Sequence, residues 1–143
     1  MNGEATVAER MHLDVENRTF LGGENFTDSP LFGIEVELEQ FDGEISFSSP
    51  PLKYWRIDDD GSLRNNGIEF ILDKPVKGYD LEQAIHEFVD YIGQCNYVVS
   101  KRCSTHVHVD VRDFKWKSLN TLTVLYCMFE KFIFEYVGSR RED

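Results

Sequence analysis

The sequence predicts an α+β protein with one main domain. Its 143 residues, of which 41% are hydrophobic and 13% aromatic, suffice for one folded core and argue against disorder. Several short stretches alternate apolar and polar residues with a period of two, which is typical of half-buried strands. Two longer stretches repeat apolar residues at helical spacing, which predicts amphipathic helices. Together these periods indicate strands and helices in the same domain.

The amino-terminal stretch, residues 1–29, differs from the remainder in being polar and poorly periodic. It ends in the turn-forming sequence "TDSP". We interpret it as a polar leader or flexible arm that precedes the α+β domain of residues 30–143.

The first predicted strand is "LFGIEVELE", residues 31–39. Apolar residues alternate with glutamates, so Glu35, Glu37 and Glu39 share one face of the strand. Taken alone, this pattern is more typical of a solvated sheet face than of a functional site.

Two more strands are predicted on either side of an acidic turn. The segment "YWRI" precedes "DDDGS", and "GIEFIL" follows a few residues later. In the last segment Ile68, Phe70 and Leu72 share one face and Glu69 lies on the other. Glu69 is therefore a further carboxylate on a polar strand face.

Helical spacing begins near Asp80 and predicts a helix that ends at Gly93. Asp80 and Gln83 fit a capping box at its start. "YVVSK" and "THVHVDVR" then read as strands, and a second helix begins at about Ser118. Its apolar stripe is wider than one helix face, which predicts an additional packing partner or a homo-oligomer.

The stretch "CSTHVHVDV" carries two histidines in a β-branched strand. His106, His108 and Asp110 share one face, and valines occupy the other. Histidines placed this way favour a functional site, although a hydrogen-bonded pair on a sheet surface is also possible.

The charge balance favours cations as ligands. The chain has 26 acidic and 15 basic residues, a formal net charge of −11. Such a charge disfavours binding to a nucleic-acid backbone and makes metal ions or metal–nucleotide complexes plausible ligands. Excess acid can also serve only to solubilise a surface.

Nothing in the sequence predicts export or membrane insertion. "MNGEATVAER" lacks the basic and apolar segments of a signal peptide, and no stretch approaches about 18 apolar residues. Three cysteines without close pairing fit reduced thiols better than disulfides. We therefore expect a cytoplasmic protein.

The polar strand faces would form one site if the strands were neighbours in a sheet. Glu35, Glu37 and Glu69 would then face His106 and His108. Carboxylates are hard oxygen ligands and imidazole suits borderline metals, so this set predicts a magnesium or manganese site rather than a thiolate zinc site.

Three motifs occur in the order "GIEVELE", "WRIDDDGSLRNNGIEFI" and "CSTHVHVDV". Over roughly residues 31–140, the chain resembles the amidoligases, carboxylate–amine ligases related to glutamine synthetase and glutamate–cysteine ligase. The resemblance implies a curved antiparallel sheet in a partial glutamine-synthetase-like fold. Its concave face would bind ATP as co-substrate with two or three Mg²⁺ or Mn²⁺ ions, and helices would cover the other face.

The resemblance also implies roles for individual residues. Glu37, Asp60 and Glu69 would hold one cation, Glu35 and His106 a second, and His108 would face the nucleotide phosphates. Arg64 and Arg140 could bind anionic substrate groups, although both also read as ordinary surface arginines. Asp60 has a rival role in turn formation. These residues together form the predicted site.

The implied reaction is amide or peptide bond formation through an acyl phosphate. The carboxylate and amine substrates would be small molecules or peptides, as in peptide modification.

The chain departs from the family pattern in two places. Ser104 stands where the family has glycine after the cysteine. The chain also stops at Asp143, before a stretch that provides another acidic ligand and basic residues in the family. We therefore expect an amino-terminal portion or a reduced form of such a ligase. The alternative is a non-catalytic module that binds metal or nucleotide.

Overall fold

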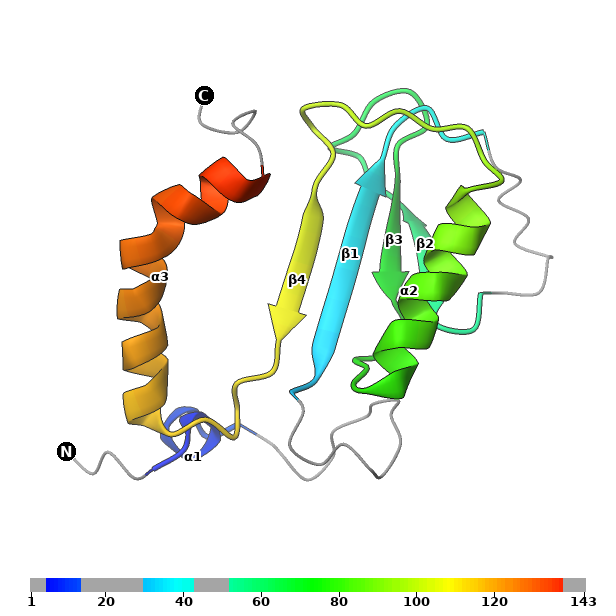
Figure 1. The fold of residues 1–143 in the computed structure, drawn as a ribbon. Coiled ribbons are helices and arrows are strands. Elements are labelled where there is room, and N and C mark those ends of the chain that lie inside the picture. The colour runs from blue at the N-terminus through cyan, green and yellow to red at the C-terminus, as the bar shows by residue number, and fades with distance from the viewer. Residues whose placement is uncertain (1–4, 14–29, 43–51, 138–143) are drawn as a thin grey trace. The chain divides into compact units, whose positions relative to one another are not determined.

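The computed structural model describes residues 5–13, 30–42 and 52–137. The chain divides into two compact units (Figure 1). One consists of Met1–Arg18 and Asp110–Asp143, and the other of Thr19–Val109. The predicted boundary between residues 29 and 30 stays a prediction, since residues 14–29 lie outside the described residues.

The unit of Thr19–Val109 contains a four-stranded antiparallel sheet. Its strands lie in the order β2-β3-β1-β4, with β1 and β3 in the centre (Figure 1). Their bounds are Phe32–Leu38 for β1, Trp55–Asp59 for β2, Ile68–Leu72 for β3 and Thr105–Val109 for β4. Together with the helices, this sheet confirms the predicted α+β class.

The strand register brings the predicted polar faces together. Glu35 pairs with His106 across β1 and β4, and Glu37 pairs with Glu69 across β1 and β3. Directly paired residues of antiparallel strands point to the same face. The carboxylates and imidazoles therefore lie on one face of the sheet.

Helix α2, Tyr79–Ile92, packs on the opposite face. The ring of Phe70 is fully buried and lies 5.2 Å from that of Phe88, centroid to centroid. The indole of Trp55 donates a hydrogen bond of 2.8 Å to the carbonyl of Ala84. These contacts attach the helix to β2 and β3, and they leave the face with the glutamates and histidines free of α2.

The capping box predicted from Asp80 and Gln83 at the start of α2 was wrong. Gly78 is the N-cap residue, with φ 56° and ψ −131°, and no side chain caps the helix. This positive φ suits glycine, since residues with a Cβ atom rarely adopt it. The carboxylate of Asp80 instead accepts a 2.6 Å hydrogen bond from the Tyr54 hydroxyl. The predicted end of the helix at Gly93 is confirmed.

The predicted strand at residues 97–101 was also wrong. Val98 forms an isolated bridge with Glu39, and the described stretch from 93 to 104 contains no strand. The amide of Cys103 turns back to the carbonyl of Ser100, which prevents an extended conformation from continuing.

The second unit contains helices α1, Val7–Met11, and α3, Trp116–Val137. Thr6 and Glu9 form a capping box at the start of α1. The amide of Val7 bonds to the carbonyl of Phe114, so this part of the predicted leader is ordered by contacts with a distant segment. Residues 14–29 of that predicted leader lie outside the described residues.

Helix α3 begins two residues before the predicted start, and many of its large apolar side chains are exposed. Among the described helices, none combines the length and the apolar character that crossing a membrane requires.

Candidate metal centre

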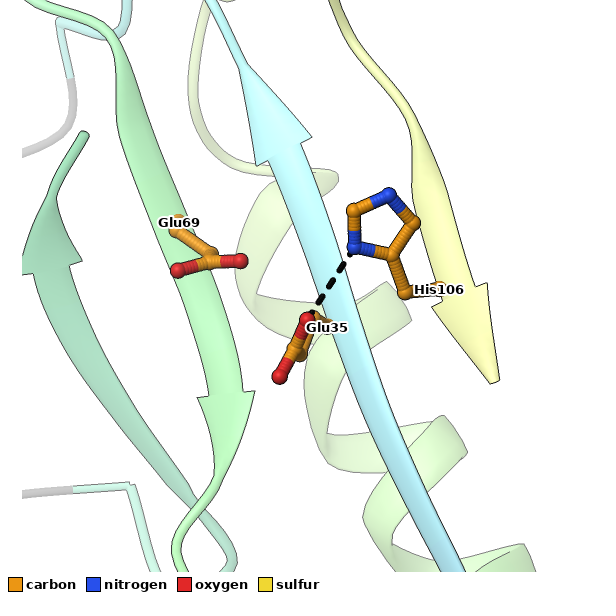
Figure 2. A group of neighbouring side chains, drawn as sticks. All are labelled: Glu35, Glu69 and His106. Carbon is orange, nitrogen blue, oxygen red and sulfur yellow. Dashed lines mark hydrogen bonds and ion pairs between the residues drawn. The ribbon is translucent and has the colours of Figure 1, made fainter. Parts of the chain in front are cut away.

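Glu35, Glu69 and His106 form a compact group on the polar sheet face. Each offers one ligand atom, and these atoms lie within 4.8 Å of one another. Figure 2 shows the three side chains directed toward one another from β1, β3 and β4. The group exists because β1 lies between β3 and β4 in the sheet.

Glu35 is held by both histidines of β4. One carboxylate oxygen, Oε2, lies 3.1 Å from Nδ1 of His106, and the other, Oε1, lies 3.3 Å from Nε2 of His108. The hydrogen bond to His106 is the main cause of a lowered pKa of Glu35, and His108 adds to it. His108, which we predicted to face nucleotide phosphates, thus contacts the same carboxylate as His106.

Glu69 has the opposite shift. Burial raises the pKa of its carboxyl group, and the nearby charges of Glu35, Asp60 and Glu37 raise it further. The ionised form of Glu69 is therefore disfavoured in the metal-free protein. A bound cation would counteract both the loss of water and the repulsion between the carboxylates.

Glu37 is buried beside this group and is linked to it through Ser104. The hydroxyl of Ser104 donates to Oε2 of Glu37 at 2.5 Å and lies 2.9 Å from Nε2 of His106. Sequence reasoning treated Ser104 only as a departure from the family pattern. Because Ser104 directly precedes the strand that carries His106, the sequence could have indicated that its hydroxyl lies near the histidine.

Asp60 lies in the loop between β2 and β3, as predicted, and it serves the turn. Its Oδ1 accepts a 2.8 Å hydrogen bond from the amide of Ser62. Asn65 and Asn66 both have positive φ, a backbone conformation that asparagine tolerates better than most residues. Asp60 is not a member of the three-residue group, but its charge contributes to the raised pKa of Glu69.

Of the two arginines predicted to bind substrate, Arg64 is among the described residues. The backbone amide of Arg64 donates to Oε1 of Glu39 at 2.8 Å, and the residue is exposed. That bond is the main cause of a lowered pKa of Glu39, to which the charge of Arg102 also contributes. Arg102, which the sequence analysis missed, thus lies near Glu39, and its guanidinium also donates to the carbonyl of Ser62 at 3.4 Å. Arg140 lies outside the described residues.

The donor set suits a hard divalent cation. Two carboxylates and one imidazole converge, and the described residues bring no cysteine into the group. Mg²⁺ and Mn²⁺ prefer oxygen ligands and accept a small number of protein donors with water completing the shell. Glu37, Asp60 and His108 surround these three and could support them.

Comparisons with protein-family models, curated proteins and solved structures found no match to the chain. The function is therefore inferred from the three sequence motifs and the geometry of the site.

Proposed function

We propose that this chain is a carboxylate–amine ligase of the amidoligase type, with a glutamine-synthetase-like catalytic fold. It would use ATP and Mg²⁺ or Mn²⁺ to form an amide or peptide bond. One observation carries the proposal: Glu35, Glu69 and His106 converge on the face of the antiparallel sheet opposite α2. The order of the three sequence motifs connects that site with ligase chemistry.

In the proposed reaction the γ-phosphoryl group of ATP passes to a substrate carboxylate, which gives an acyl phosphate and ADP. An amine then attacks the acyl carbon, phosphate leaves, and the amine loses a proton as the amide forms. Divalent cations neutralise the oxygens of the transferring phosphoryl group and keep the reactants in line. Glu35, Glu69 and His106 would fix these cations on the sheet.

The residues around the group would supply further interactions. With a cation bound to Glu35, Nε2 of His108 would be available to donate to a phosphate oxygen instead of to that carboxylate. Arg64 and Arg102 flank Glu39 at the end of β1, and they could bind an anionic substrate group. Asp60 would keep the β2–β3 loop in place beside Glu69.

A non-catalytic module that binds metal is the second candidate. It is favoured by the contacts of the two histidines, since both contact Glu35 rather than standing free to receive phosphate. Such a module would bind a cation on the same residues but would not turn over ATP.

The first test is calorimetric titration of Mn²⁺ into the wild type and into Glu35→Gln and Glu69→Gln variants. Glu82→Gln is the matched control, because Glu82 is an exposed carboxylate on α2, on the other side of the sheet. The proposal expects binding in the wild type and the control and its loss in both site variants. Absence of Mn²⁺ binding in the wild type would contradict both candidates.

The second test separates the two candidates. A non-hydrolysable ATP analogue is titrated in the presence of Mn²⁺, and ATP turnover is then assayed with mixed amino acids and hydroxylamine as the amine. A ligase should release phosphate and form hydroxamate only when a carboxylate substrate is present. Mn²⁺ binding without nucleotide binding or turnover would favour the non-catalytic module.

A further inference from the structure

We propose that Ser104 is a positioning residue of the candidate metal centre, joining Glu37 to His106 so that Nδ1 of the imidazole faces the cation. The inference rests on the metal site proposed above. It assigns Glu37 a role different from the one implied by the family resemblance. Glu37 would support His106 through Ser104 rather than bind the cation directly.

The distances determine where the single proton of the Ser104 hydroxyl goes. Oγ of Ser104 is 2.5 Å from Oε2 of Glu37 and 2.9 Å from Nε2 of His106. An ionised carboxylate has no proton to give and can only accept. The hydroxyl therefore donates to Glu37, and its lone pairs accept the N–H at Nε2 of His106.

Because Nε2 of His106 donates to Ser104, the other ring nitrogen, Nδ1, is the one that can bind a cation. Nδ1 lies 3.1 Å from Oε2 of Glu35, on the side where Glu69 also converges. In Figure 2 the labelled ring directs this nitrogen toward Glu35 and its second nitrogen away from it. A cation held by Glu35 and Glu69 would accept the lone pair of this nitrogen.

An arrangement of this kind is common among metal-binding histidines. The ring nitrogen that does not bind the metal usually donates to a carboxylate, a carbonyl or water, which fixes the ring orientation. Here a hydroxyl and a buried carboxylate together provide that acceptor. Glu37 is only 9% exposed, so it stays in place without an ordering cost when the cation binds.

The residue that stands at position 104 also matters. A residue without a hydroxyl there could not join Glu37 to His106. Loss of the hydroxyl should weaken cation binding without removing any cation ligand.

The test compares Ser104→Ala, Ser104→Thr and the control Thr105→Ala. Thr105 is the adjacent residue on the strand, exposed, and its side chain points to the opposite sheet face. Without metal, NMR records whether the proton on Nε2 of His106 is protected from exchange with water. Calorimetry then measures the affinity of each protein for Mn²⁺.

We expect a protected Nε2 proton in the wild type, in Ser104→Thr and in Thr105→Ala, and its loss in Ser104→Ala. Mn²⁺ affinity should fall about tenfold in Ser104→Ala and stay near the wild-type value in the other two. Glu37→Gln should cause a similar fall, and combining it with Ser104→Ala should add little, since both break one connection.

The outcomes distinguish this inference from the metal site on which it rests. Wild-type Mn²⁺ binding that Ser104→Ala leaves unchanged would overturn the role of Ser104 and leave the site standing. An Nε2 proton that exchanges freely in the metal-free wild type would overturn it as well. Absence of Mn²⁺ binding in the wild type would overturn the metal site itself, and the role of Ser104 with it.

Discussion

Burial and repulsion from neighbouring carboxylates both raise the pKa of Glu69. Its raised pKa means that the folded protein holds a proton on Glu69 more tightly than the unfolded chain does. The stability of the metal-free fold should therefore decrease as pH rises from the ordinary carboxyl range, near 4.5, through the pKa of the folded state. Ionised Glu69 thus acts against folding until a cation binds.

The Glu69→Gln variant tests this cost. Without metal at pH 7 it should unfold at a higher temperature than the wild type, and the difference should shrink as pH falls, because Glu69 then becomes protonated. With Mn²⁺ the order should reverse, since the variant lacks a ligand. Thermal unfolding with a chelator or with Mn²⁺ measures both effects. A lower unfolding temperature in the chelated variant at pH 7 would contradict the explanation.

Glu35 should show the opposite pH dependence. Its lowered pKa means that the ionised carboxylate is stabilised in the folded state, chiefly by His106. This contribution is present above the ordinary value of 4.5 and is lost as pH falls through the lower pKa of the folded state.

Glu35→Gln should therefore destabilise the chelated protein near neutral pH by about 0.5–1 kcal/mol, because the half-exposed partner His106 limits the gain. The difference from the wild type should disappear as pH falls through the lowered pKa of Glu35 in the folded state. Denaturant titrations between pH 3 and 7 measure it. A difference that grows in acid would show that the hydrogen bond to His106 is not the cause.

At the scale of elements, the loop between β2 and β3 holds Asp60 beside the site. A Cβ atom added to Gly67 would lie 2.1 Å from Cβ of Leu63, which is buried, whereas one added to Gly61 would meet nothing within 4 Å. The two glycines of this loop are therefore a matched pair with opposite expectations.

Gly67→Ala should destabilise the protein by about 1–3 kcal/mol, because the loop backbone must move to admit the methyl group. Gly61→Ala should change stability by less than about 0.5 kcal/mol. Chemical denaturation measures both, and Mn²⁺ titration shows whether the movement reaches Glu69. Equal effects of the two substitutions would contradict the importance of the contact with Leu63.

The elements were predicted with unequal success, for a physical reason. The strands around Glu35, Glu69 and His106 follow from alternation, since side-chain direction in a strand is set by the local backbone. The strand predicted at residues 97–101 failed, because the β-branched residues there suit an extended chain while the turn at Ser100 and Cys103 ends it. The capping box Thr6–Glu9 was readable in the sequence and was overlooked.

At the scale of the molecule, cation binding should stabilise the sheet as a whole. Each of the strands β1, β3 and β4 supplies one of the three candidate ligands. A cation bound to these ligands therefore favours the folded state, in which the strands are paired. The effect should reach backbone amides well away from the ligands.

Hydrogen exchange at the amides of β1 and β4 measures this stabilisation. At a concentration of Mn²⁺ about 100 times its Kd, the folded sheet should gain about 2.7 kcal/mol, which slows exchange by about a hundredfold for amides that exchange through unfolding. Glu82→Gln should behave as the wild type, and Glu35→Gln should show no slowing. Equal slowing in Glu35→Gln would place the cation elsewhere.

The sequence by itself determined which side chains share a strand face. Alternation of side chains is a local property of a strand. It therefore placed the site residues on the polar side of their strands: Glu35 and Glu37 on the first, Glu69 on the second, and His106 and His108 on the third. The same reasoning predicted α2 and α3 and the α+β class. Which strands are neighbours could not be read this way, because pairing depends on contacts between residues distant in the chain.

Tertiary structure alone decided how these faces combine. The order β2-β3-β1-β4 and the register between Glu35 and His106 place the three donors within reach of one cation. The same packing brings the hydroxyl of Ser104 between Glu37 and His106, and turns His108 toward Glu35. These are side-chain contacts across separate strands and loops, and only the folded sheet fixes their distances.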